Sequence, residues 1–146
     1  MIIKKTPEEI EKIAAAGEIH ARTMQLVAGK IAPGVTTAQL DEAAERFIRS
    51  QGAEPSFKGY NGFPGSICAS PNSMVVHGIP GSYTLAEGDI LSVDIGVTLD
   101  GWVADAACTF AVGEVSVEAE SLIAVTEASL LASVEQVQNG GRIGDI

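Results

Sequence analysis

The sequence predicts an α+β (α/β) domain in which an antiparallel sheet is flanked by helices. Two capped, amphipathic helical patterns come first, a stretch dense in glycine, proline and asparagine follows, and the pattern returns to helix near the end. Before that last helix, two apolar runs meet at Asp100-Gly101, a dipeptide typical of β-hairpin turns. With 146 residues, the chain is long enough to form one domain with a buried core.

The first predicted helix covers residues 6–31. Thr6 is placed to cap it, Pro7 to occupy its first turn and Glu9 to complete a capping box. We interpret His20, which flanks the apolar stripe of this helix, as a structural residue. The stripe itself recurs at helical spacing and consists of Ile10, Ile13, Ala14, Gly17, Ala21, Met24, Val27, Ala28 and Ile31.

The second predicted helix follows the "APGVTT" break. Thr36 and Gln39 form another capping box, and Gly52 is a plausible stop. Its predicted buried stripe consists of Leu40, Ala43, Ala44, Phe47 and Ile48.

A third helical pattern begins at its cap, Ser116, and is expected to end at Gly140-Gly141. When the chain is shifted by 106 residues, residues 31–40 lie over residues 137–146 and the first helix lies over the third. Identities are few, so either an internal repeat or chance explains the match. If the repeat is real, the second unit contributes one helix and a few residues more.

The hairpin at Asp100-Gly101 places two aspartates on one face. A two-residue turn sets Gly96 opposite Asp105 and puts Asp94 on the same face, while the other face is apolar and predicted to join the core. In this register the backbones of Asp94 and Asp105 are diagonal neighbours, about 7–8 Å apart. Either the pair holds one or two metal ions through hard oxygen ligands, or it lies in water on an exposed face.

Three further side chains are candidates for chemistry or for packing. His77, in "MVVHGIP", could be a ligand, a proton donor or a surface histidine. We expect Cys68 and Cys108 to be small core residues. No nucleophile motif, P-loop or dinucleotide fingerprint is present.

Composition excludes several classes of partner. Hydrophobic residues make up 46% and charged residues 19%, which indicates a globular chain. The net charge of -10 disfavours nucleic acid and anionic membranes. No signal peptide or membrane-length apolar run is present, and two cysteines make no disulfide framework. We therefore expect a soluble cytoplasmic protein with reduced thiols.

The motifs together resemble the N-terminal half of the type I methionine aminopeptidases. Their sequences are most similar to those of bacterial, actinobacterial-like members. The resemblance runs from Lys4 to Ile146. It rests on "KTPEEIEKIAAAG", "PGVTTAQLDEAAERFI", "GYNGFPGSICASPNSMVVHGIPG", "GDILSVDIGVTLDGWVADAACTFAVGE" and "TEASL".

This resemblance implies half of a pita-bread (creatinase/aminopeptidase) fold. Residues 1–146 would form its first pseudo-repeat and the first helix of the second, with the second half absent. It also implies removal of the initiator methionine from nascent chains by two divalent metal ions (Co, Mn, Fe or Zn). Asp94 and Asp105 match metal ligands, and His77 matches a catalytic histidine that contacts substrate.

Four residues match positions that line the methionine side-chain pocket: Tyr60, Phe63, Cys68 and Phe57. Phe57 falls where the family often has a smaller residue, and Phe63 where tyrosine is frequent. Both changes keep the lining apolar, as a thioether requires.

The family's remaining ligands, a histidine and two glutamates, lie in its second half, as does a second catalytic histidine. We therefore expect an open sheet edge, an uncovered apolar face and no activity from this chain alone. The expected partners are a nascent polypeptide N-terminus and either a complementary C-terminal half or a second copy of the chain. A homodimer of half-domains and a non-catalytic pita-bread binding protein are the alternative functions. Prolidase and aminopeptidase P are rivals within the fold.

Overall fold

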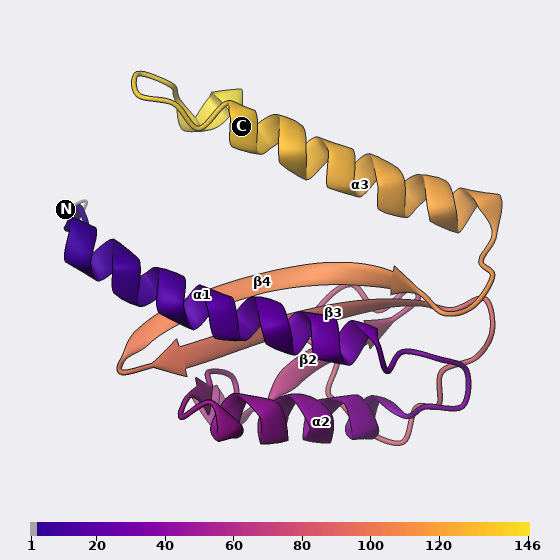
Figure 1. The fold of residues 1–146 in the computed structure, drawn as a ribbon. Coiled ribbons are helices and arrows are strands. Elements are labelled where there is room, and N and C mark those ends of the chain that lie inside the picture. Colours follow the sequence, from indigo (N-terminus) through magenta and orange to yellow (C-terminus); the bar gives the residue numbers. More distant parts are fainter. Residues whose placement is uncertain (1–2) are drawn as a thin grey trace.

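The computed structural model describes residues 3–146 and shows a four-stranded antiparallel sheet with helices packed against it (Figure 1). Strand β3 is central, because it pairs with β4 on one side and with β1 and β2 on the other. The strands are β1 (Glu54–Pro55), β2 (Ile67–Pro71), β3 (Ile90–Leu99) and β4 (Trp102–Ala111). The helices are α1 (Pro7–Ala28), α2 (Thr37–Ser50) and α3 (Val117–Glu135), with short 3-10 turns at Tyr60–Gly62 and Ile143–Asp145.

The predicted starts of α1 and α2 are confirmed. The Thr6 hydroxyl accepts a hydrogen bond from the Glu9 backbone at 3.2 Å, and the Glu9 carboxylate accepts one from the Thr6 backbone at 2.8 Å. Thr36 and Gln39 make the same reciprocal pair at the start of α2. These bonds satisfy backbone donors that a helix leaves free at its first turn.

Helix α3 starts as predicted but ends early. The Ser116 hydroxyl accepts a hydrogen bond from the Ala119 backbone at 3.2 Å. The helix ends at Glu135, so the predicted end at Gly140-Gly141 is wrong. The Gln138 side-chain amide donates to the Glu135 carbonyl at 2.8 Å, which satisfies one terminal acceptor before the glycines are reached.

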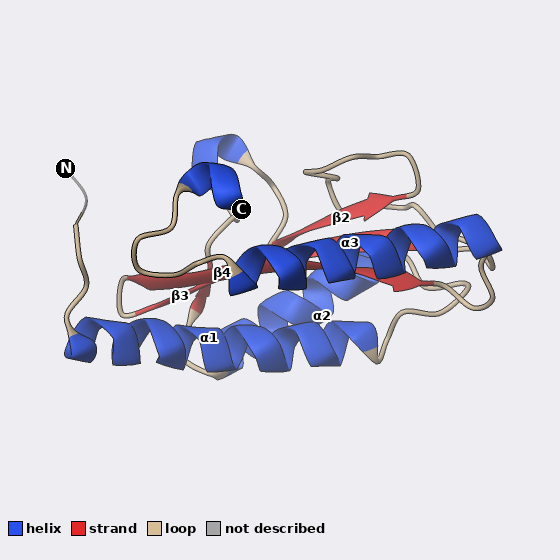
Figure 2. Ribbon diagram, turned by 90° about the horizontal axis from the view of Figure 1, so that it is seen from above, coloured by secondary structure: helices blue, strands red, loops and turns tan. Residues whose placement is uncertain are grey.

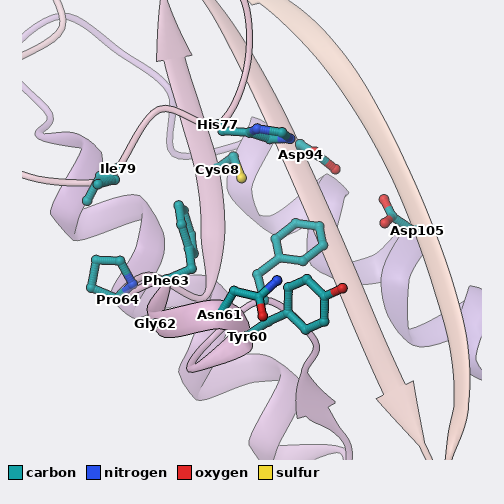
Figure 3. Close-up of a pocket in the computed structure, with 11 residues that line it drawn as sticks. Tyr60, Asn61, Gly62, Phe63, Pro64, Cys68, His77, Ile79, Asp94 and Asp105 are labelled. Atoms are coloured by element: carbon teal, nitrogen blue, oxygen red, sulfur yellow. The ribbon is translucent and has the colours of Figure 1, made fainter.

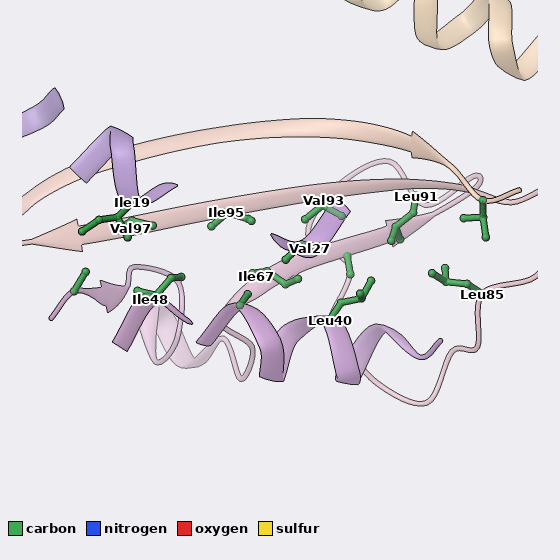
Figure 4. Close-up of a cluster of buried hydrophobic side chains, with 14 residues drawn as sticks. Ile19, Val27, Leu40, Ile48, Ile67, Leu85, Leu91, Val93, Ile95 and Val97 are labelled. Carbon is green, nitrogen blue, oxygen red and sulfur yellow. The ribbon is translucent and has the colours of Figure 1, made fainter. Parts of the chain in front are cut away.

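The core lies between one face of the sheet and helices α1 and α2 (Figure 4). Alternate residues of β3 point into it and are fully buried: Leu91, Val93, Ile95 and Val97. Helix α2 contributes Leu40, Ala44 and Ile48 as predicted. The buried side of α1 differs from the predicted stripe, since Ile10 is 54% exposed. It consists of Ala16, Ile19, His20, Thr23 and Val27.

His20 is a structural residue in this arrangement, as predicted. Its imidazole is buried on α1, and Nε2 lies 3.2 Å from the backbone carbonyl of Ala106 on β4. The contact ties α1 to the outer strand of the sheet.

The β4 half of the apolar face is less covered than predicted. Cys68 is buried on β2, but it lies on the face opposite the core cluster, so it is not the core residue that we expected. Cys108 is exposed, and so is Ala106. The core prediction for Cys108 is therefore wrong. The physical reason is position, because β4 pairs only with β3 among the described strands and so forms an edge of the sheet.

Helix α3 leaves a large apolar surface uncovered. It lies alongside β4, on the other side of that strand from α2 (Figures 1 and 2), and contains no buried residue. The exposed apolar side chains of α3 and the segment after it include Leu122, Val125, Leu130, Leu131, Val134, Val137, Ile143 and Ile146. An apolar surface of this kind is typical of an interface. Within residues 3–146, no helix has the length and apolar character needed to cross a bilayer.

Candidate metal and substrate site

The hairpin register predicted from Asp100-Gly101 is confirmed. Asp94 pairs with Ala107, and Gly96 pairs with Asp105, so both carboxylates rise from the same face of the β3–β4 hairpin. On the other side of β3, Cys68 lies directly opposite Asp94. Cys68, Asp94 and Asp105 thus form a row across three strands, on the sheet face opposite the core.

A cavity of about 520 Å³ opens over this row (Figure 3). All seven residues that the sequence singled out line it: Phe57, Tyr60, Phe63, Cys68, His77, Asp94 and Asp105. Figure 3 shows the carboxylates of Asp94 and Asp105 facing each other from neighbouring strands, with His77 beside Asp94. Asn61, Gly62, Pro64 and Ile79 complete the lining. The cavity therefore has an acidic side and a mainly apolar side.

The two carboxylates repel each other. Burial, then the negative charge of Asp105 and a hydrogen bond shared with it, raise the pKa of Asp94 from 3.8 to about 6. His77 and His20 act in the opposite direction. No lysine or arginine in residues 3–146 forms an ion pair with either aspartate. The paired charges are thus left for a cation to compensate.

The same environment makes Cys68 a neutral lining residue. Burial, followed by the charges of Asp94, Asp105 and Asp41, raises the pKa of its thiol to about 11. A thiol with so high a pKa stays protonated near neutral pH and is a poor nucleophile. Cys68 therefore contributes shape and apolar surface to the cavity.

His77 is placed by a loop that folds back onto β2. Its own φ is 58°, in the left-handed region, and it is exposed to solvent. The next residue, Gly78, accepts a hydrogen bond from the Ala69 backbone at 2.9 Å and donates one to the buried Ser70 hydroxyl at 3.0 Å. A Cβ at Gly78 would lie 2.2 Å from the Ala69 carbonyl oxygen. Only glycine allows the loop to approach the strand this closely.

The aromatic side of the cavity is fixed to helix α2. Lys58 forms an ion pair with Glu45 of α2, and this interaction, with a smaller one from Arg49, holds the pKa of Glu45 down to about 2. The Asp41 carboxylate accepts hydrogen bonds from the backbones of Ser66 and Ile67 at 2.7 and 3.0 Å. Helix α2 thereby holds both ends of the segment that carries Tyr60 and Phe63.

The donor set suits part of a divalent metal site. Two carboxylates that form no ion pair with a lysine or arginine of residues 3–146 provide hard oxygen ligands on one face. Within residues 3–146, no group of three or more histidine, cysteine, aspartate or glutamate side chains could hold a metal ion. A complete site of at least three protein ligands would therefore need donors from outside the described residues.

Comparison with known proteins identifies the family. Residues 11–146 match the model of metallopeptidase family M24. The chain is 52% identical to a methionine aminopeptidase of Clostridium acetobutylicum and 50% identical to methionine aminopeptidase 1 of Bacillus subtilis, in each case over 100% of this chain and 59% of the relative. A crystal structure of the Thermotoga maritima methionine aminopeptidase superposes with a TM-score of 0.92 and 37% identity, covering 94% of this chain and 56% of that one.

The fold and the matches define a pita-bread metallopeptidase, and the chain belongs to family M24. It corresponds to the N-terminal portion of a methionine aminopeptidase, and it spans 59% of the length of these curated relatives. Membership of a metallopeptidase family implies the use of divalent metal ions. Because these relatives are methionine aminopeptidases at 50–52% identity over the whole chain, the comparisons do not favour a prolidase or a non-catalytic binding protein.

Sequence reasoning missed three residues that shape the site. Gly78 and Ser70 position the His77 loop, and Gly96 lies on the site face opposite Asp105 and two residues after Asp94. The "HGIP" motif contains Gly78, but nothing local indicates that its partner is Ser70. The strand alternation predicted from the sequence places Gly96 on the face of Asp94 and Asp105. It does not show that Phe57 and Ser56 occupy the space next to Gly96.

Proposed function

We propose that this chain supplies the first half of the active site of a methionine aminopeptidase, which removes the initiator methionine from nascent polypeptides. The observation that carries the proposal is the position of Asp94 and Asp105, whose carboxylates share one face and line an apolar cavity. Similarity to methionine aminopeptidases over the whole chain supports it. Because nascent chains emerge in the cytoplasm, the proposed location is cytoplasmic.

Asp94 and Asp105 would hold the divalent ions, for which Co, Mn, Fe and Zn are all candidates. When bound, such ions polarise the scissile carbonyl and activate the attacking water. His77, beside Asp94 at the mouth of the cavity, would hydrogen-bond the substrate near the scissile bond.

The apolar side of the cavity would receive the methionine side chain. Tyr60, Phe63, Cys68 and Phe57 line it together. Aromatic rings and a neutral thiol are suitable surroundings for a flexible thioether, which makes favourable contacts with ring edges. Specificity for methionine would come from this wall, and catalysis from the acidic side.

Residues 1–146 would form the first pseudo-repeat of a pita-bread domain and the first helix of the second repeat. A complementary C-terminal segment would then cover α3 and the edge of β4 and complete the ligand set. The exposed apolar residues of α3 support this arrangement. A second copy of the chain could cover the same surface, but it would bring only further carboxylates to the site.

The test uses a fusion in which the remainder of the Bacillus subtilis relative is attached to this chain. The fusion should release methionine from Met-Gly-Met in a metal-dependent reaction that a chelator stops. Asp94→Asn and Asp105→Asn should each abolish release, while Asp100→Asn, the same change in the exposed hairpin turn, should not. A folded, metal-supplied fusion that cleaves no methionine peptide would refute the proposal.

A further inference from the structure

The backbone of His77 has a conformation that residues other than glycine seldom adopt. Its φ is 58°, in the left-handed region, where a β-carbon crowds the neighbouring carbonyl. A residue stays in such a conformation only when its surroundings impose it. His77 itself is exposed to solvent, so the constraint has to come from the loop backbone beside it.

The loop is fastened to the N-terminus of α2 four residues after His77. The Thr37 hydroxyl donates to the Gly81 carbonyl at 3.1 Å and accepts a hydrogen bond from the Gly81 backbone N–H at 2.9 Å. The backbone N–H of Ala38 donates to the same carbonyl at 3.0 Å, and that of Thr37 donates to the Tyr83 carbonyl at 3.0 Å. The first turn of α2 therefore satisfies both backbone groups of Gly81.

Little freedom remains between this attachment and His77. Gly78 is already bonded to β2, so only Ile79 and Pro80 separate the two attachments. Proline fixes φ, and the Pro80 ring lies against Gly65, where a Cβ would be 2.8 Å from Pro80 Cδ. A displacement of the loop at its α2 end would therefore be passed on to Gly78 and His77.

We propose that Thr37 is a positioning residue for the His77 imidazole. By holding Gly81, its hydroxyl keeps the loop in the conformation that brings His77 beside Asp94 (Figure 3). Thr37 is 1% exposed and lies outside the cavity lining, so it acts through the loop. The role of His77 toward substrate rests on the proposed function. The dependence of its backbone conformation on Thr37 does not.

The test compares two substitutions of Thr37. Thr37→Val keeps the shape of the side chain and removes the hydroxyl, whereas Thr37→Ser keeps the hydroxyl. Thr23→Val is the matched control, because Thr23 is equally buried and its hydroxyl donates to the Ile19 carbonyl within α1 at 2.7 Å. If Thr37→Val does not fold, Thr37→Ala replaces it, since alanine is a good helix former and leaves room for a water at the Gly81 N–H.

The first measurement reads the His77 backbone in the 146-residue chain by NMR. The chain contains two histidines, His20 and His77, so isotope-labelled histidine gives two Cα–Cβ signals whose positions report φ and ψ. Thr37→Val should move or split the His77 signal. The His20 signal should stay in place, because His20 is held on α1 beside the Ala106 carbonyl. Thr37→Ser and Thr23→Val should leave both signals unchanged.

The second measurement is the release of methionine from Met-Gly-Met by the fusion described above. Thr37→Val should lower kcat by up to about 100-fold, because a small misplacement of a group beside the reacting atoms can cost that much. KM should stay nearly unchanged, and Thr37→Ser should restore most of the rate. In a His77→Ala background, Thr37→Val should change kcat by less than about twofold, since its effect acts through His77.

An unchanged His77 signal in folded Thr37→Val would overturn the inference. Equal losses of kcat with and without His77 would also overturn it, because Thr37 would then act by another route. Failure of both Thr37→Val and Thr37→Ala to fold would do the same, since Thr37 would then support the whole domain. A shifted His77 signal in a chain whose fusion releases no methionine would support the inference and contradict the proposed function, so the two can fail separately.

Discussion

The Gly78 backbone N–H donates a hydrogen bond at 3.0 Å to the hydroxyl of Ser70, a side chain that is only 3% exposed. Gly78 directly follows His77, so a contact on β2 determines where the loop places this imidazole. The bond is buried and links residues that are eight positions apart. Ser70 lies on the same face of β2 as Cys68, so the bond connects the site face of the sheet to the loop beside the cavity.

Ser70→Ala removes the acceptor and should destabilise the chain by about 1–3 kcal/mol, the cost of leaving a buried donor unsatisfied. Chemical denaturation measures the change. Ser73→Ala, an exposed serine in the same loop, is the control and should change stability by less than about 0.5 kcal/mol. Equal effects from the two substitutions would show that the Ser70 contact does not stabilise the loop.

Gly78→Ala should have a larger effect than Ser70→Ala. Its Cβ would overlap the Ala69 carbonyl at 2.2 Å and the Met74 sulfur at 2.6 Å, and the carbonyl belongs to a strand that cannot move aside cheaply. We expect a loss of about 3 kcal/mol or more. Gly81→Ala, whose Cβ has no neighbour closer than 3.9 Å, should be tolerated. Comparable unfolding midpoints for the two variants would contradict the close approach.

Asp94→Asn should change how stability depends on pH in the absence of metal. The pKa of Asp94 is raised from 3.8 to about 6 in the folded chain. Between these values the folded state keeps a proton that the unfolded state has released, so this group makes stability fall as pH rises. Urea midpoints measured from about pH 4 to pH 7 should fall less in Asp94→Asn than in the wild type. Identical slopes would contradict the raised pKa.

The 146-residue chain should self-associate when it is alone. The apolar side chains of α3 are exposed, with Val125 at 64% and Leu130 at 61%, and β4 is an open edge of the described sheet. Light scattering at micromolar concentration should show species larger than a monomer. A monodisperse monomer would contradict this expectation.

The same chain should have negligible methionine aminopeptidase activity by itself. Only two aspartates of the proposed ligand set lie within residues 3–146, and a catalytic site ordinarily needs at least three protein ligands. Release of methionine from Met-Gly-Met by the purified chain is the measurement. Rapid release of methionine that a chelator abolishes would contradict this prediction, because the chain alone would then be sufficient for catalysis.

Local signals in the sequence were enough to predict the helix starts and the hairpin register. The capping boxes at Thr6 and Thr36 and the Asp100-Gly101 turn act over a few residues, so a reader of the sequence can place them. Because strand side chains alternate, the register alone brings Asp94 and Asp105 to one face. The candidate site follows from that geometry and from the resemblance to the family.

Features that depend on distant contacts could not be predicted in this way. The exposure of Cys108 depends on what covers β4, and the buried side of α1 depends on how that helix lies on the sheet. The Ser70–Gly78 contact and the space above Gly96 are set by loops that return to the sheet from elsewhere in the chain. Such contacts leave no periodic pattern in the sequence.

Metal binding by the fusion described above tests most directly the claim that Asp94 and Asp105 are metal ligands. Isothermal titration with Mn²⁺ should show that Asp94→Asn and Asp105→Asn each weaken Mn²⁺ binding at least about 100-fold. Mutation of a residue that only hydrogen-bonds to a metal ligand typically lowers metal affinity about 10–100-fold, and loss of a ligand itself should cost at least as much. Asp100→Asn should bind like the wild type, and circular dichroism should show all four proteins folded. Unchanged Mn²⁺ affinity in folded Asp94→Asn and Asp105→Asn would contradict the account.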